Sequence, residues 1–366
     1  MFLLGCAGET PLRVPVEAPE VISGEGGLSV SWSNKLAADV DAPKGVFKPA
    51  VQGDQIIVAS NRGLIRAYSQ SEGDTLWTYD VDLKLAAGVS ANQDALIVIG
   101  RNGEIIALSP EGQFLWQHET EKEILSPASL TSKLAVVQAV DGSVVGLNLK
   151  TGEPQWVFSE VIPSLTLRGT GRPFIFKDRV ILGFASGKLV ALKLSNGEKL
   201  WEQVIQKPQG QNEFERVIDL DAAISAKENV LFVPGYQGFF TAIEAYRGQV
   251  LWQKQHSSFQ GGDFYVDRLY TVNESSHIQV MDYRNGEIQW QSQDYEYRDV
   301  LQPKILGDYL VFSDYEGYIH LMDRFSAQTR DRLKLGPAPV RLIVEGESVY
   351  GLASNGKLKK IQLQKD

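Results

Sequence analysis

The sequence has 366 residues, of which 43% are hydrophobic and 22% are charged. This composition is ordinary for a globular protein and argues against extended disorder and against a polytopic membrane protein. The net charge is −9, so the chain lacks the basic surface with which proteins bind nucleic acids. A single cysteine excludes an intrachain disulfide and a cysteine-rich metal centre.

The first 27 residues read as a tether rather than as a strand or a helix. The stretch after the cysteine carries three prolines and four glycines among small and polar residues, a composition that favours an extended chain. Leu3-Leu4-Gly5-Cys6 resembles the lipobox of bacterial lipoproteins. That resemblance implies a signal-sequence remnant in residues 1–5, lipidation of Cys6 and a flexible lipidated tether over residues 6–27.

Two further points concern this segment. Residue 7 is alanine rather than aspartate, which by the lipoprotein sorting rule implies the outer membrane of a Gram-negative bacterium, with the protein on its periplasmic face. A signal peptide normally brings a cationic region and a longer apolar region, and only five residues precede Cys6. The alternative interpretation is an incidental free cysteine in a frayed terminus.

An internal repeat organises the chain after residue 28. Six of the seven tryptophans follow a glycine by four residues, and nine or ten residues before that glycine stands another glycine or, once, a serine. A seventh copy is degenerate, with Asp331 where the tryptophan would fall, and an eighth begins at Gly356 without finishing. The tryptophans are Trp32, Trp77, Trp116, Trp156, Trp201, Trp252 and Trp290.

The repeat length predicts a closed ring. Eight units of roughly 42 residues match the four-stranded antiparallel blade of a β-propeller. The first short strand, Leu28 to Trp32, lacks a repeat of its own and is expected to complete the unfinished eighth blade. We therefore predict an all-β fold, with residues 28–366 as one eight-bladed β-propeller domain closed by the N-terminal strand.

The repeated tryptophan is expected to be structural, because a residue that recurs once per blade performs the same task in every blade. We predict that it docks against the next blade and binds no ligand. A small residue also recurs four residues after the first glycine of the repeat, which we attribute to close approach between blades. It is found at Ala67, Ala107, Gly146, Ala191 and Ala242.

These repeats resemble the tryptophan-docking repeats of quinoprotein dehydrogenases. Enzymes of that class hold pyrroloquinoline quinone and a calcium ion, and many carry a vicinal disulfide, which one cysteine cannot form. The four histidines lack metal-ligand spacing, and no Gly-x-Ser-x-Gly, Walker-type or calcium-loop motif is present. We expect neither a cofactor, nor a metal site, nor catalytic residues.

Interruptions of the repeat are the better place to look for a binding surface. The tryptophan intervals are 45, 39, 40, 45, 51 and 38 residues, and the long fourth and fifth intervals are adjacent. The excess lies in residues 157–172 and 202–221, each just before an inner strand. Together these insertions are predicted to form one surface with apolar anchors and a charged rim. Its candidate residues are Leu165, Leu167, Arg168, Asp219 and Asp221.

The lipobox, the Pro-rich tether, the eight quinoprotein-like blades and the two insertions together resemble the BamB family of lipoprotein subunits in the outer-membrane β-barrel assembly machinery. The segment from Asp314 to His320 fits that family as well. The resemblance implies that Leu165, Leu167, Arg168, Asp219 and Asp221 contact the POTRA domains of BamA. It also implies a non-catalytic scaffold that assists the insertion of nascent outer-membrane proteins.

Other interpretations of the residues remain open at this point. Leu165 and Leu167 alternate as the core face of a strand does, and Asp-x-Asp spacing also occurs elsewhere in the chain. Asp219 paired with Arg168 would stiffen a loop without any partner. A quinoprotein-type enzyme, a lectin or sensor propeller, and a structural propeller with another partner are the alternative functions.

Overall fold

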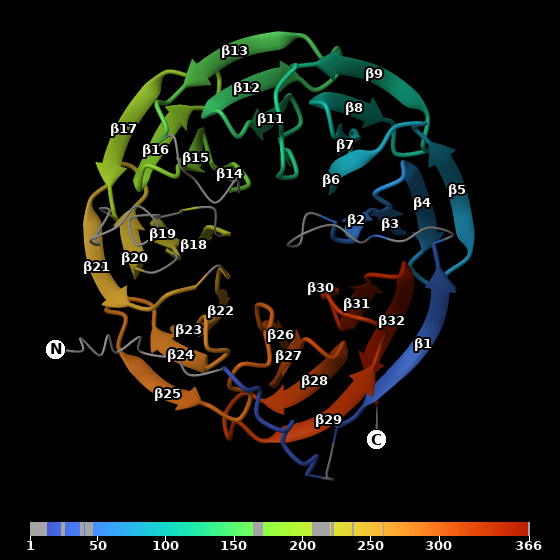
Figure 1. Cartoon of the computed structure of the whole chain (residues 1–366), viewed down its shortest axis with the longest axis vertical. Coiled ribbons are helices and arrows are strands. Elements are labelled where there is room, and N and C mark those ends of the chain that lie inside the picture. Colours follow the sequence, from blue (N-terminus) through green and yellow to red (C-terminus); the bar gives the residue numbers. More distant parts are fainter. Residues whose placement is uncertain are drawn as a thin grey trace, which may run out of the picture.

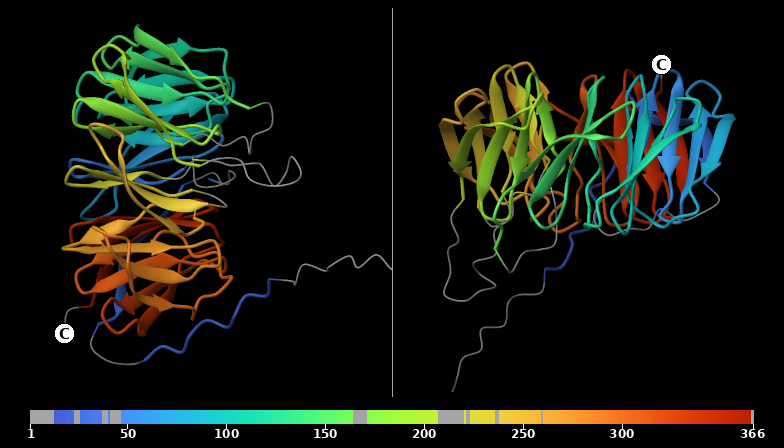
Figure 2. Two further views of the ribbon diagram at one scale, coloured as in Figure 1. Left: turned by 90° about the vertical axis from the view of Figure 1, so that its left-hand side faces the viewer. Right: turned by 90° about the horizontal axis from the view of Figure 1, so that it is seen from above.

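The computed structural model describes residues 13–22, 26–36, 40, 47–163, 171–206, 220, 223–235, 238–258 and 260–364. These residues form eight four-stranded antiparallel sheets, arranged as the blades of a closed ring around a central axis (Figure 1). Seen from the side, the ring is a short cylinder (Figure 2). The predicted all-β, eight-bladed propeller is therefore confirmed. No helix in the described ranges is long and apolar enough to cross a membrane.

Seven blades are built from consecutive strands that run from the axis to the rim. In chain order they are blade 1, β2 (Ala50–Gln52), β3 (Gln55–Ala59), β4 (Leu64–Ser69), β5 (Thr75–Asp80); blade 2, β6 (Leu85–Ala91), β7 (Leu96–Gly100), β8 (Glu104–Leu108), β9 (Phe114–Glu119); blade 3, β10 (Ser129–Leu130), β11 (Leu134–Gln138), β12 (Ser143–Asn148), β13 (Pro154–Ser159); blade 4, β14 (Phe174–Phe176), β15 (Arg179–Gly183), β16 (Lys188–Lys193), β17 (Lys199–Val204); blade 5, β18 (Ser225–Lys227), β19 (Val230–Val233), β20 (Phe239–Glu244), β21 (Val250–Gln255); blade 6, β22 (Asp263–Tyr265), β23 (Arg268–Val272), β24 (Ile278–Asp282), β25 (Ile288–Ser292); and blade 7, β26 (Lys304–Leu306), β27 (Tyr309–Ser313), β28 (Tyr318–Asp323), β29 (Thr329–Lys334).

The eighth blade joins the two ends of the chain. Its inner three strands are β30 (Val340–Glu345), β31 (Ser348–Ala353) and β32 (Lys357–Leu363), and its rim strand is β1 (Leu28–Lys35). β1 pairs antiparallel with β32 from Leu28 opposite Leu363 to Lys35 opposite Lys357. The first described strand therefore closes the last blade, as the incomplete repeats predict.

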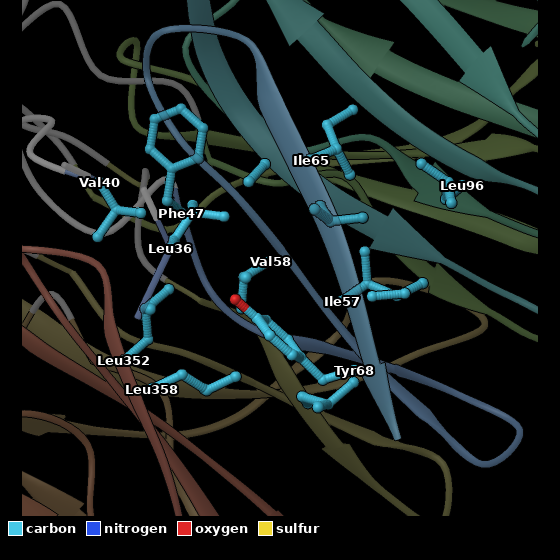
Figure 3. Packing of buried hydrophobic residues seen from close by; sticks show 14 of the residues in the cluster. Leu36, Val40, Phe47, Ile57, Val58, Ile65, Tyr68, Leu96, Leu352 and Leu358 are labelled. Carbon is cyan, nitrogen blue, oxygen red and sulfur yellow. The ribbon is translucent and has the colours of Figure 1, made fainter. Parts of the chain in front are cut away.

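The hydrophobic core lies between blades rather than within one. The middle strands are apolar on both faces, and β7, β8, β11 and β15 are buried along their whole length. Figure 3 shows one cluster in which Leu352 and Leu358 of blade 8 pack with Val58 of blade 1, and Leu96 of blade 2 belongs to the same cluster. Since each large aliphatic side chain stabilises the fold by about 1.5–3 kcal/mol when buried, neighbouring blades hold each other in place.

The tryptophans connect consecutive blades, as expected from their recurrence. Within the described ranges, six indole Nε1 groups donate a hydrogen bond to a backbone carbonyl of the next blade. The acceptors, with the N···O distances, are Gln70 for Trp32 (3.1 Å), Pro110 for Trp77 (3.1 Å), Leu149 for Trp116 (2.8 Å), Leu194 for Trp156 (2.9 Å), Ala245 for Trp201 (3.0 Å) and Tyr283 for Trp252 (3.0 Å).

The same six indoles lie against the repeat glycine of the next blade. These glycines have φ of +69° to +79°, and a Cβ on any of them would lie 2.5–2.8 Å from the indole. Trp290 is the exception, because the next blade carries Ala327 in place of the glycine. The Nε1 group of Trp290 has no hydrogen-bond partner among the described residues. The absence of a side chain at these six glycines therefore makes room for the tryptophan of the preceding blade.

The small residue of the third strand has a second cause besides the expected approach between blades. Each of these residues pairs directly with the tryptophan of its own sheet, as Ala67 does with Trp77 and Gly146 with Trp156. A Cβ on Gly146 would lie 2.3 Å from the Trp156 ring. The indole of the same blade therefore requires a small residue here, in addition to the packing between blades, since Ala107 and Ala191 also belong to clusters shared with the next blade.

We expect Gly197→Ala to destabilise the ring by about 2–4 kcal/mol, because the methyl group meets the Trp156 ring at 2.8 Å in addition to the penalty of a positive φ. Gly346→Ala is the matched control, since Gly346 has φ +57° and no atom within 4 Å of its Cβ position. That variant should cost only about 1–2 kcal/mol. Urea denaturation measures both, and equal losses would contradict the docking role of the glycine.

Candidate functional site: the connection face of the ring

One face of the ring carries two kinds of loop. The connections from the rim strand of one blade to the inner strand of the next lie beside the turns between second and third strands. Backbone hydrogen bonds join them, for example from Val81 to the Gly63 carbonyl (3.2 Å) and from Glu160 to the Gly142 carbonyl (3.0 Å). We call this side the connection face; the remaining hairpin turns lie on the opposite side (Figure 2).

The site residues predicted from the sequence lie outside the described residues. This applies to Leu165, Leu167, Arg168, Asp219 and Asp221, and also to Cys6. The structure does describe the chain on both sides of each insertion. The first insertion leaves blade 3 after β13 and rejoins the fold at β14, and the second runs from β17 to β18. Both insertions therefore begin and end on the connection face, on the two sides of blade 4.

The ends of the first insertion are held by polar contacts. Glu160, whose side chain is 10% exposed, forms an ion pair with Lys188 at 2.8 Å. The hydrogen bond from Lys188 to Glu160 raises the pKa of the lysine. On the other side, the Ser126 hydroxyl donates to the Gly171 carbonyl (3.4 Å), and Arg172 Nε donates to Ser129 Oγ (3.1 Å). Blades 3 and 4 thus fix where this insertion starts and stops.

The ends of the second insertion are held mainly by apolar contacts. Leu220, which separates Asp219 from Asp221 in the sequence, is 1% exposed and packs in the cluster of Ile205 and Ile224. Gly183 leaves room for it, because a Cβ there would lie 2.4 Å from the Leu220 carbonyl oxygen. A buried leucine between two acidic residues therefore anchors this part of the chain to the interface of blades 4 and 5.

The N-terminal segment, residues 13–22, lies against blade 7. The Val16 amide donates to the Glu296 carbonyl (3.1 Å), the Val16 carbonyl accepts from Arg298 Nη1 (2.9 Å), and the Ile22 amide donates to the Thr329 carbonyl (3.0 Å). Glu296 and Arg298 belong to the connection between blades 6 and 7, whereas Thr329 begins β29 at the opposite side. The segment therefore crosses the rim, with its N-terminal end at the connection face.

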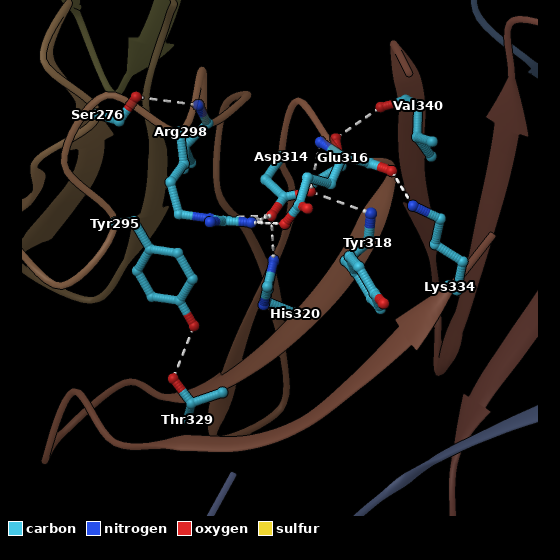
Figure 4. Close-up of polar contacts among 12 residues, drawn as sticks. Ser276, Tyr295, Arg298, Asp314, Glu316, Tyr318, His320, Thr329, Lys334 and Val340 are labelled. Carbon is cyan, nitrogen blue, oxygen red and sulfur yellow. Dashed lines mark hydrogen bonds and ion pairs between the residues drawn. The ribbon is translucent and has the colours of Figure 1, made fainter. Parts of the chain in front are cut away.

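A buried ionic network positions Arg298 for this contact (Figure 4). Asp314 Oδ2 accepts hydrogen bonds from Arg298 Nη2 (2.6 Å) and from His320 Nε2 (3.0 Å). Asp314 Oδ1 accepts from the amides of Glu316 and Tyr318, each at 3.1 Å. Burial alone would raise the pKa of Asp314, but the hydrogen bonds from His320 and Arg298 outweigh it and lower the pKa to about 2.

No sequence pattern points to Arg298. Asp314 and His320, six residues apart across one hairpin, were a signal for a pair, although the family resemblance assigns them no role. Arg298 lies 16 residues before Asp314 in an irregular connection, so no periodicity marks it.

The described residues contain no group of three or more His, Cys, Asp and Glu side chains placed to hold a metal ion. Two of the four histidines are buried in the fold. Burial lowers the pKa of His256 to about 4, so that its ring is neutral near pH 7, and His320 is bound to Asp314. What the connection face offers is a surface formed by loops on a rigid ring, which suits the binding of a macromolecule.

The eight blades and the tryptophan-on-glycine contacts define the class of this protein as a quinoprotein-like β-propeller. Its fold superimposes on quinohemoprotein alcohol dehydrogenase from Comamonas testosteroni with a TM-score of 0.71 at 12% sequence identity, over 92% of this chain and 76% of the other. BamB from Moraxella catarrhalis gives a TM-score of 0.82 at 22% identity, over 92% of this chain and 99% of that one. At these identities the likeness establishes the fold alone.

The sequence comparisons establish the family. A family model described as outer membrane protein assembly factor BamB matches residues 61–292. The proteins of that name from Shewanella oneidensis and Vibrio cholerae are each 30% identical to this chain, and in both cases the match covers 99% of this chain and 96% of the relative. The chain belongs to the BamB family of outer membrane protein assembly factors, which confirms the resemblance seen in the sequence.

Proposed function

We propose that this protein is a non-catalytic scaffold lipoprotein of the outer-membrane β-barrel assembly complex. In this role it binds the POTRA domains of BamA and assists the folding and insertion of outer-membrane proteins. The relatives in Shewanella oneidensis and Vibrio cholerae, named as outer membrane protein assembly factors, support this role. The observation that carries the proposed interface is that both insertions open on the connection face, on the two sides of blade 4.

The proposed interface consists of Leu165, Leu167, Arg168, Asp219 and Asp221. Leucine side chains buried against a partner supply hydrophobic anchors, and a charged rim around them selects the partner and its orientation. The buried Leu220 and the ion pair between Glu160 and Lys188 support this assignment, because they fix the bases of the two insertions on a rigid ring.

The proposed membrane anchor is a lipidated Cys6, on the periplasmic face of the outer membrane, with residues 6–27 as the tether. The path of residues 13–22 supports a defined orientation, since its N-terminal end lies at the connection face. The anchor and the BamA interface then lie on the same face of the ring. A partner domain close to the membrane is within reach of both.

Arg168→Glu should weaken the binding of isolated POTRA domains by about 2–5 kcal/mol, which is roughly 30-fold to several thousandfold in affinity. The reversed charge removes a contact and adds repulsion. Binding is measured by isothermal titration calorimetry, and circular dichroism verifies that the variant is folded.

The matched control is Lys150→Glu, the same charge reversal at an exposed residue in a turn of blade 3 on the opposite face. It should bind as the wild type does. A folded Arg168→Glu variant with wild-type affinity would show that the interface lies elsewhere.

A further inference from the structure

Four basic residues lie where inner strands of the ring begin. Lys48 and Arg172 stand two residues before β2 and β14, Lys304 is the first residue of β26, and Arg341 is the second of β30. Each inner strand follows a connection from the preceding blade, so all inner strands start on the same face. The parallel bridge between Phe47 and Gly88 of adjacent blades agrees with this direction. The four residues, the axial cation cluster, therefore lie on the connection face.

The four residues belong to separate blades, each at the strand of its sheet that lies beside the ring axis. Blades 4 and 8 lie on opposite sides of the ring (Figure 1), yet Lys48 of blade 1 interacts electrostatically with Arg172, Arg341 and also Lys304. Lys48 and Arg172 are exposed, and Lys304 and Arg341 are half-buried. A ligand in solution therefore has access to the charges.

Two effects lower the pKa values of these four residues, namely burial by the surrounding protein and, for Lys48, repulsion by the neighbouring cations. The surroundings of Lys48 withdraw water from its ammonium group although solvent still reaches it. That burial, followed by the charges of Lys304, Arg341 and Arg172, lowers the pKa of Lys48 to about 8. Burial also lowers the pKa of the three other members. Collecting these charges is unfavourable without a counter-charge.

The described part of the chain supplies little compensation. None of the four cations forms an ion pair with a described carboxylate. Asp263 attracts Lys304 and Asp299 attracts Arg341, but only at longer range. The Asp263 carboxylate is already engaged by the amides of Phe264 (3.0 Å) and Ile305 (3.1 Å). Among the described residues, these four positive charges are therefore only weakly compensated, although the chain as a whole has a net charge of −9.

We propose that the axial cation cluster binds a multivalent oxyanion of the phosphate type, either free or as a lipid headgroup. Several cations that approach from different blades suit a tetrahedral anion, because its oxygens point in several directions and each accepts charge-assisted hydrogen bonds. The two arginines supply planar donor forks and the two lysines supply compact charges. This site shares the connection face with the proposed BamA interface but consists of other residues.

The test is calorimetric titration of the full chain with inorganic pyrophosphate in a buffer without phosphate. We expect saturable binding that weakens as NaCl rises from about 50 to 300 mM. Lys48→Gln should weaken binding about tenfold or more, because it removes a charge-assisted hydrogen bond at the centre of the cluster. Without ligand, this variant should melt at the wild-type temperature or above it, since a repulsion is relieved. Lys150→Gln on the opposite face is the control and should bind normally.

Dihexanoyl phosphatidate, a soluble short-chain lipid, distinguishes the two sources of the anion. Tighter binding than that of pyrophosphate identifies a headgroup site, and weaker binding identifies a site for a free anion. Absence of pyrophosphate binding to the wild type would overturn the proposal. Equal affinities of the wild type and Lys48→Gln for pyrophosphate would overturn it as well. So would binding of a hexaglutamate peptide that pyrophosphate does not displace, because the cluster would then select carboxylates.

Discussion

Deletion of residues 1–33 should destabilise the ring far more than deletion of residues 1–20. The longer deletion removes most of β1, including Leu28 and Trp32, which are 6% and 9% exposed. Burial of two such side chains contributes about 1.5–3 kcal/mol each, and the pairing with β32 adds backbone hydrogen bonds. We therefore expect a loss on the order of 5 kcal/mol or more.

The contacts of Trp32 explain why this loss of stability reflects failed ring closure. Its indole belongs to blade 8, donates to the Gln70 carbonyl of blade 1 (3.1 Å) and packs 6.5 Å from the Tyr68 ring centroid. Tyr350 of blade 8 donates to the side chain of the same Gln70 (2.7 Å). Without Trp32, blades 8 and 1 lose this hydrogen bond and the packing of the indole on Tyr68.

The shorter deletion serves as the control. It removes Val16 and its two hydrogen bonds to blade 7 but leaves the whole of β1, so that a loss of only about 1–2 kcal/mol is expected. Urea denaturation followed by tryptophan fluorescence compares the two truncations. Equal midpoints would contradict closure by the N-terminal strand.

Asp314→Asn should lower the stability at pH 7 by about 3–5 kcal/mol, because it leaves Arg298 buried with too little counter-charge. The Arg298 and Asp314 side chains are 3% and 0% exposed. Asp141→Asn provides a matched control in the corresponding turn of blade 3. Its ion pair with Lys122 (2.8 Å) is half exposed, so its loss should cost less than about 1 kcal/mol.

The effect of Asp314 should depend on pH with a defined sign. Its pKa is about 2 in the folded protein, below the value of about 3.9 for an unfolded aspartate. A lowered carboxyl pKa stabilises the fold above about pH 4, and this contribution disappears as the pH falls towards 2. The stability difference between wild type and Asp314→Asn should therefore shrink between pH 5 and about 3. A constant difference over this range would show that charge is not the cause.

The sequence alone determined the architecture, because blade structure repeats. The spacing of glycine and tryptophan reports the blade length, and the incomplete eighth repeat reports how the ring closes. The same regularity located the two insertions beside blade 4, because an insertion changes the interval between tryptophans. The insertions contain Leu165, Leu167, Arg168, Asp219 and Asp221, whose role at an interface is implied by the family resemblance. That role stays a prediction, because these residues lie outside the described residues.

Only the tertiary structure decided which distant residues meet. Arg298 reaches Asp314 and Val16 from an irregular connection, and the cations of the axial cluster come from four blades spread over nearly 300 residues of sequence. It also showed that Gly146, the small residue opposite Trp156, makes room for the indole of its own sheet. Periodicity records what every blade repeats. Contacts made once, across the axis or across the rim, depend on ring closure in three dimensions and leave no period in the sequence.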